Sequence, residues 1–132
     1  MEPIKVVLRY IDGTMLKGYA RNLHPHRPTF HFQTNAQASS SMEFGVDGLK
    51  ALFLVKSFEG DPDYRERNEF VEGDMPCESK VEVTFRDGEI MQGCIVGYHP
   101  EQPGFFLRPA DPESNNILVL ARSAAVKGLR RL

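Results

Sequence analysis

The sequence lacks tryptophan, long apolar runs and any leader-like N-terminus. Its 132 residues include nine Phe and no Trp, so phenylalanine supplies most of the large aromatic side chains of any core. No stretch reaches the roughly 18 apolar residues that a membrane-spanning helix requires. The first ten residues have neither the basic region nor the apolar stretch of a secretory signal. We therefore expect a cytoplasmic protein that binds no membrane.

Cysteine is equally scarce. The chain has only Cys77 and Cys94, and their spacing is not that of a CxxC motif. Since disulfides are rare in the cytosol, we expect both thiols to be reduced rather than joined. No residues have the pattern of a nucleophile beside a base or of a phosphate-binding glycine loop. The sequence therefore predicts no cofactor and no enzymatic activity.

An internal repeat organises the chain. Residues 5–30 align with residues 80–105 at an offset of 75, and the matches include Asp-Gly, Gly, His-Pro, Pro and Phe. The closing segments 49–52 and 126–129 correspond at an offset of 77. The second copy therefore has a two-residue insertion, which we place in the turn-rich segment 109–116. Self-similarity on this scale indicates a duplicated structural unit.

The repeat divides the chain into a first unit, residues 1–56, a connector, residues 57–79, and a second unit, residues 80–132. The net charge of the whole chain is −2. The connector carries eight acidic residues against two Arg, which gives −6, so the two units together carry +4. Phosphate-driven binding of nucleic acid usually requires a more basic surface. Apolar residues between the connector's charges predict that part of it docks on a folded unit, although its acidic residues around Tyr64 also resemble an interaction segment.

Each unit is expected to contain five short strands, because apolar and polar residues alternate and no long helical period occurs. The Asp-Gly pairs at 12–13 and 87–88 predict hairpin turns. Gly18 and Gly93 predict a bulge or a sharp bend in the second strand, of the kind that closes a small barrel. The expected strands cover residues 5–10, 15–23, 30–32, 41–44 and 49–55, and then 80–86, 90–98, 105–107, 117–121 and 126–132.

This pattern resembles the Sm-like small β-barrel. The residues that match its first motif are Asp12, Gly13 and Gly18 in the first unit and Asp87, Gly88 and Gly93 in the second. The family's RNA-reading Asp-x-x-x-Asn loop is replaced by residues 24–28 and 99–103, and only Arg122-Ser123 is similar to its second turn. The resemblance implies an all-β fold of two tandem five-stranded Sm-like or SH3-like barrels, packed together and joined by an acidic connector. It does not imply RNA binding.

The tandem pattern also resembles an uncharacterised bacterial family. The resemblance includes residues 58–64, which follow the first unit, and residues 103–112, which precede the last strands. Members look like modules of regulatory proteins. No activity is known for them, so the resemblance assigns no site residues.

A contact surface is predicted where the two copies differ. Phe106 aligns with His31 and should point outward from the third strand, next to Arg108. An outward Phe favours packing against the other barrel or the connector, and a partner protein is the alternative. The candidate contact residues are Phe106, Arg108, Arg122, His31 and Arg27.

A metal site is not favoured by the histidines. His24, His26 and His31 are close in the sequence, but the second copy retains only His99 of this group. Zinc requires three or four convergent ligands. Because His24 and His99 both precede proline, which forces an extended backbone, we expect them to shape a turn.

We therefore expect a non-enzymatic interaction or regulatory module in a bacterial cytoplasm, with a protein partner or a second copy as its ligand. Sheet edges of five-stranded units must be covered, and Sm-like barrels continue their sheets between subunits. The alternative is an RNA or nucleotide binder that uses Arg21, Arg27, Arg108 and Arg122 with the outward aromatic side chains. Salt would distinguish the two, because affinity that depends on phosphate contacts falls steeply with ionic strength.

Overall fold

The structure is a computed structural model of the chain. It describes residues 4–21, 23–24, 27–35, 42–60, 63–65, 67, 69–73, 76–96 and 101–132. These residues form ten strands and one 3-10 turn, Ser123–Ala125, and none of them lies in an α-helix. The prediction of an all-β protein is therefore confirmed.

Every expected strand is present. The first copy contains β1 (Ile4–Tyr10), β2 (Met15–Arg21), β3 (Thr29–Gln33), β4 (Met42–Gly45) and β5 (Leu49–Val55). The second contains β6 (Lys80–Phe85), β7 (Ile90–Val96), β8 (Gly104–Pro109), β9 (Asn116–Arg122) and β10 (Val126–Arg131).

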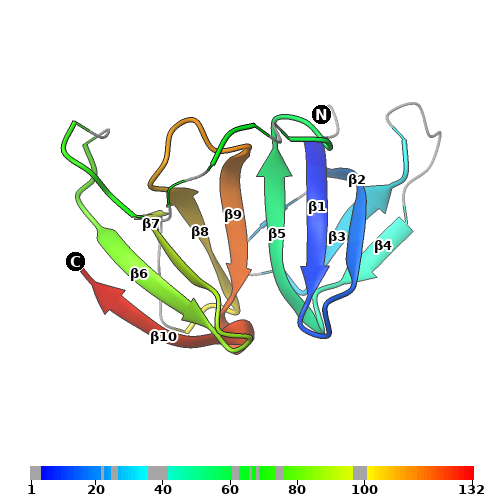
Figure 1. The fold of residues 1–132 in the computed structure, drawn as a ribbon. Helices are drawn as coiled ribbons and strands as arrows, with labels where there is room; N and C mark the ends of the chain where they lie inside the picture. The colour runs from blue at the N-terminus through cyan, green and yellow to red at the C-terminus, as the bar shows by residue number, and fades with distance from the viewer. Residues whose placement is uncertain are drawn as a thin grey trace.

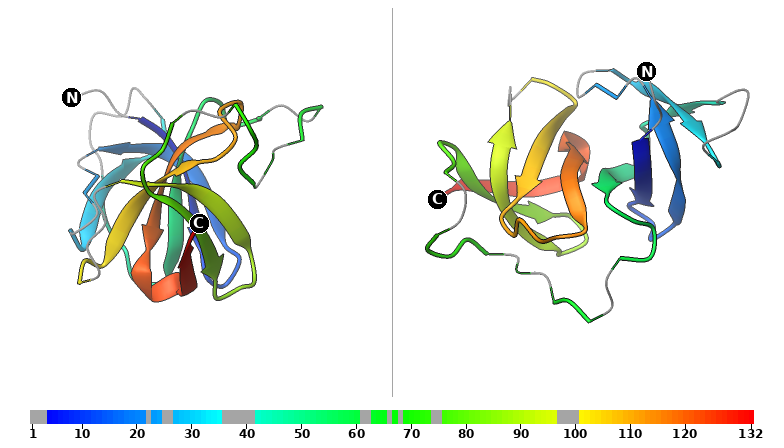
Figure 2. Two further views of the ribbon diagram at one scale, coloured as in Figure 1. Left: turned by 90° about the vertical axis from the view of Figure 1, so that its left-hand side faces the viewer. Right: turned by 90° about the horizontal axis from the view of Figure 1, so that it is seen from above.

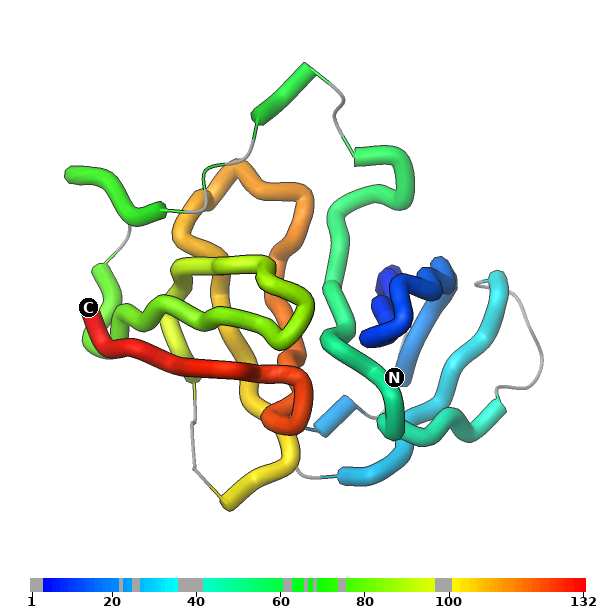
Figure 3. The backbone as a smooth tube through the Cα atoms, turned by 60° about the horizontal axis from the view of Figure 1, so that its bottom comes forward, coloured from blue at the N-terminus to red at the C-terminus, as the bar shows by residue number. Residues whose placement is uncertain are grey.

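The strands form one antiparallel sheet in the order β10-β6-β7-β8-β9-β5-β1-β2-β3-β4 (Figure 1). Within each copy the order is fifth, first, second, third, fourth. The sheet curves strongly, so that its two halves lie side by side when seen from above (Figure 2). The copies are joined where β5 pairs with β9 (Figure 3). Leu52 lies opposite Leu120 in this joint.

Strand pairing repeats between the copies residue by residue. Thr29 of β3 pairs with Gly45 of β4, and Gly104 of β8 pairs with Arg122 of β9. The offset between copies is thus 75 residues at the third strand and 77 at the fourth. The two-residue insertion therefore lies between β8 and β9, as the sequence predicts.

The alternating residues of the first strands face the core. Val6, Leu8, Val81 and Val83 are all at most 1% exposed. The buried side chains form two clusters, but the boundary between them does not follow the repeat. The cluster inside the second half also contains four residues of the first copy, namely Val7, Ala51, Phe53 and Val55. In return, Leu120 of β9 belongs to the cluster of the first half, so the joint is packed from both sides.

The duplicated glycines have two different roles. Gly13 and Gly88 have φ angles of 94° and 98°, which confirms the predicted Asp-Gly turns. A Cβ atom on Gly18 would lie 2.7 Å from the Gln33 carbonyl oxygen, and one on Gly93 would lie 2.5 Å from that of Arg108. The β1–β2 and β6–β7 pairings show no register shift at these positions. Gly18 and Gly93 therefore permit close approach of the third strand rather than a bulge.

Candidate functional site

The predicted anchor Phe106 belongs to the joint between the copies. It lies on β8, is half-buried and packs against the core cluster of the first half. This is the alternative that the sequence favours for an outward Phe. His31 is half-buried on β3, whereas Arg27 is exposed in the segment between β2 and β3.

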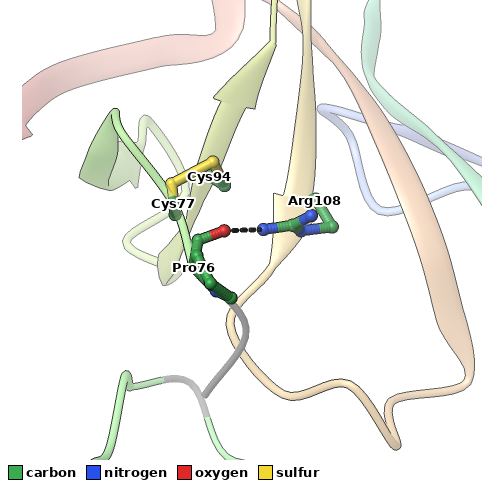
Figure 4. The surroundings of a disulfide bond; sticks show 4 residues. All are labelled: Pro76, Cys77, Cys94 and Arg108. Carbon is green, nitrogen blue, oxygen red and sulfur yellow. Dashed lines mark hydrogen bonds between the residues drawn. A yellow bond between two sulfur atoms is a disulfide. The ribbon is translucent and has the colours of Figure 1, made fainter. Parts of the chain in front are cut away.

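Arg108 is half-buried and binds the connector. Its Nη2 atom donates a hydrogen bond of 3.2 Å to the Pro76 carbonyl, next to a disulfide between Cys77 and Cys94 (Figure 4). The expectation of reduced thiols was wrong. The connector folds back along β7, which brings two residues 17 apart in sequence to a Cα–Cα distance of 5.9 Å. That approach depends on tertiary structure, so cysteine spacing does not reveal it.

The connector is also held at Asp111, a buried residue that follows β8. The Tyr64 hydroxyl donates a hydrogen bond of 2.5 Å to its carboxylate, and the Arg67 amide donates another of 3.0 Å. Burial raises the pKa of Asp111, but these hydrogen bonds outweigh it and hold the pKa below its ordinary value. The hydrogen bond to Asp111 raises the pKa of Tyr64 to about 12. Tyr64 is thus bound to the second half of the sheet.

A third set of contacts holds the connector nearer β6. The Phe70 amide donates a hydrogen bond of 3.0 Å to the Gln92 side chain. The Lys80 ammonium lies 4.8 Å from the centre of the Phe70 ring, which is within cation–π distance. The connector side chains Tyr64, Phe70 and Cys77 therefore all contact the second half.

Two further arginines are partly enclosed, namely Arg122 of the candidate contact surface and Arg21, which was named only for RNA or nucleotide binding. Arg122 is half-buried, and this burial lowers its pKa, while the negative charge of Asp47 opposes the effect. The Nε atom of Arg21 is buried and has no hydrogen-bond partner in the part of the chain that the structure describes. With Arg108 bound to Pro76, only Arg27 of the four arginines is exposed.

A buried lysine crosses the joint. Lys50 of β5 is 4% exposed, and its Nζ atom lies 2.7 Å from the Asp87 carboxylate and contacts that of Glu89. The same atom lies 4.8 Å from the centre of the Phe85 ring. The hydrogen bond from Lys50 lowers the pKa of Asp87. The sequence gives no signal for this role, because the equivalent lysine of the second copy, Lys127, is exposed.

An apolar groove beside β4, which we call the β4 groove, was not predicted from the sequence. It encloses about 450 Å³. Met42 is 69% exposed and Leu16 is 40% exposed at this edge of the sheet. Among the described residues β4 pairs only with β3, so its other side offers unpaired main-chain groups. The groove is lined by Leu16, Lys17, Phe32, Gln33, Thr34, Met42 and Phe44.

The corresponding surface of the second half is covered. Met91 and Val119 are the equivalents of Leu16 and Met42, and they are 6% and 0% exposed. They belong to the cluster that contains Phe53 and other side chains of the first copy. In the second half these positions are covered by side chains of the first copy, and in the first half the same positions are uncovered and form the β4 groove. The alternation of Met42 and Phe44 around Glu43 is the signal that could have indicated it.

Neither a metal site nor a membrane span is found among the described residues. No three His, Cys, Asp or Glu side chains converge there. His26 and His99 lie outside the described residues. No helix in the described ranges is long and apolar enough to cross a membrane.

Comparison with known proteins gives a family but no function. No curated protein and no solved structure matches the chain. Residues 2–132 match the model of DUF6982, a family of unknown function, so the chain belongs to that uncharacterised family.

Proposed function

We propose that the chain is a non-enzymatic protein-interaction module that binds an extended strand of a partner along β4. The observation that carries this proposal is the β4 groove, where Met42 is 69% exposed beside an edge strand. In strand addition the main chain supplies hydrogen bonds, and pockets for alternate side chains supply specificity. The chemistry of the edge fits a strand with apolar side chains toward Met42 and a basic side chain near Glu43.

The repeat supports a strand as the ligand. The edge of the second copy that corresponds to β4 is β9, and β9 is covered by the extended strand β5. Each half of the sheet has the strand order fifth, first, second, third, fourth. We therefore assign each half as one five-stranded Sm-like or SH3-like barrel unit, with the acidic connector docked on the second.

Protein contacts are favoured over RNA or nucleotide binding by the state of the arginines. Phosphate-driven binding needs basic side chains that reach solvent. Arg108 is bound to Pro76, Arg122 is half-buried, and a guanidinium nitrogen of Arg21 is buried. Of the four arginines predicted to bind nucleic acid, only Arg27 is exposed, so the basic surface that they offer is small.

For location we propose the bacterial cytoplasm. The Cys77–Cys94 disulfide bears directly on this proposal, because disulfides in cytosolic proteins of mesophiles are usually transient or redox-sensing. Alkylation of free thiols at the moment of cell lysis, followed by mass spectrometry, measures the oxidised fraction. A fully oxidised pair would contradict a reducing compartment.

A displayed library of random peptides tests the proposed function. Panning on the full chain is expected to recover peptides with alternating apolar residues that bind Met42→Lys at least tenfold more weakly. Ile90→Lys is the matched control, since Ile90 is 49% exposed on β7, and it is expected to bind the peptides as the wild type does. Recovery of no peptides, or of peptides that bind the wild type and Met42→Lys equally, would refute strand addition at β4.

A further inference from the structure

We infer that the strand that β4 binds is β10 of a second copy of this chain, so that copies join head to tail. The inference rests on the function proposed above and names its partner. Strands β10 and β4 are the two ends of the sheet, and in the described part of the chain each has one neighbour, β6 and β3 respectively. One molecule thus presents two different unpaired edges.

The chain already contains an example of the joint that these edges would form. β10 corresponds to β5, because Leu129 pairs with Val83 as Leu52 pairs with Leu8, and the fifth strand of each copy skips one residue at the same place. β4 corresponds to β9 at an offset of 77. Inside the chain, the fifth strand of one copy pairs with the fourth strand of the other. The same pairing between molecules joins β10 to β4.

The internal joint also fixes the register of the proposed one. The internal pairs Ala51–Ala121, Leu52–Leu120 and Phe53–Val119 become Gly128–Phe44, Leu129–Glu43 and Arg130–Met42. Side chains alternate between the two faces of a strand. Glu43 therefore lies opposite Leu129 on the same face as Arg131, two residues further along β10. Diagonal neighbours of this kind are within reach of long side chains.

The charges of the two edges are complementary. Glu43 is the single charged residue of β4, whereas β10 carries Lys127, Arg130 and Arg131 and no acidic residue. Pairing β4 with a second β4 would bring two glutamates together, and pairing β10 with a second β10 would bring its cations together. Like charges across a strand pair are destabilising. Head-to-tail pairing is therefore favoured over either symmetric arrangement.

Side chains at the end of β10 can also cover the proposed joint. Leu132 corresponds to Val55, which helps to cover the second half, and Leu132 is 50% exposed in one molecule. Arg130 corresponds to Phe53, and its guanidinium forms an ion pair of 3.1 Å with Glu82 of its own chain. With the charge neutralised in this way, the aliphatic stem of Arg130 can lie over Met42. In the proposed joint, Leu132 and Arg130 thus take the places that Val55 and Phe53 have in the internal joint.

A head-to-tail joint repeats from one molecule to the next. Such an interface gives a closed ring if the rotation from one molecule to the next returns to the first molecule, and a filament if it does not. Either outcome gives a mass that is a multiple of the 14.9 kDa of one chain.

Sedimentation equilibrium of the full chain tests the inference. The wild type is expected to exceed 14.9 kDa, and Glu43→Lys and Arg131→Glu are each expected to weaken association at least tenfold. A 1:1 mixture of the two variants is expected to regain the wild-type mass, since one joint then has the native charges and the next has them reversed. Glu72→Lys and Arg65→Glu make the same changes at exposed connector positions and are expected to assemble like the wild type. Recovery in the mixture also shows that both variants are folded.

Three results would overturn the inference. The first is a wild-type monomer at every concentration. The second is assembly that neither edge variant weakens. The third is assembly that depends on Glu43 and not on Arg131, which would indicate pairing of β4 with β4. If the wild type is monomeric but library peptides still need Met42, strand addition at β4 stands and only the identity of the partner fails.

Discussion

Replacement of Lys50 by methionine tests how strongly the two halves of the sheet are held together. Methionine is an unbranched side chain one atom shorter than lysine, and it removes the charge. Breaking a fully buried ion pair costs about 3–5 kcal/mol, and breaking a solvent-exposed one costs about 0–1 kcal/mol. Lys50 is buried, but the side chains of Asp87 and Glu89 are 39% and 36% exposed, so water solvates part of both carboxylates. We therefore expect Lys50→Met to lower the free energy of unfolding by about 1–3 kcal/mol, between these two limits.

The measurement is urea denaturation followed by far-ultraviolet circular dichroism, because the chain has no tryptophan. Lys127→Met is the matched control, since Lys127 holds the same position in β10 but is exposed. Its effect is expected to stay within about 0.5 kcal/mol. If both substitutions change the stability equally, the reasoning about the joint is wrong.

The effect of Lys50→Met is also expected to depend on pH. Lys50 holds the folded-state pKa of Asp87 below its ordinary value. This contribution to stability is therefore complete above the ordinary aspartate pKa of about 3.9 and is lost as the pH falls through the folded-state pKa. The difference between wild type and Lys50→Met should be full at neutral pH and shrink in acid. A difference that does not change in acid would show that charge is not its cause.

Three further predictions concern the connector and the strands. Replacing Cys77 and Cys94 by serine opens a loop of 17 residues and is expected to lower the free energy of unfolding by up to about 3 kcal/mol, and dithiothreitol should reproduce this loss in wild type but not in the variant. Gly93→Ala is expected to cost about 1–3 kcal/mol by overpacking, whereas Gly128→Ala, with no atom within 4 Å of the new Cβ, should change stability little in the same urea titration. Tyr64→Phe should remove one phenol that ionises at about pH 12 from a spectrophotometric titration, and loss of a phenol near pH 10 instead would contradict its hydrogen bond to the buried aspartate.

The strands could be predicted because their signals are local. Alternation in β1 and β6 depends on neighbouring residues, and the turns at Gly13 and Gly88 depend on one backbone angle each. The repeat then carried each assignment from one copy to the other. Even the insertion between β8 and β9 could be placed, because the change of offset showed that it exists and the turn-rich residues 109–116 indicated where it lies.

What could not be predicted depends on how the two copies meet. Phe53 and Leu120 look like ordinary core residues of their own strands, yet each packs into the other half. Lys50 and Lys127 are the same residue at the same place in the repeat, but only Lys50 faces the turn of the other copy. The β4 groove has the same origin, because it exists where one copy is not covered by the other, whereas the disulfide depends on the path of the connector along β7.

The β5–β9 joint has a consequence for the strength of the two kinds of pairing. Covalent linkage makes the internal pairing a first-order process, with an effective concentration that is on the order of millimolar for a short flexible linker. In the self-association proposed above, the edges β4 and β10 would receive no such help, so their pairing would depend on the concentration of the protein. Under that proposal, duplication within one chain makes the β5–β9 joint independent of expression level, whereas the joint between molecules responds to it.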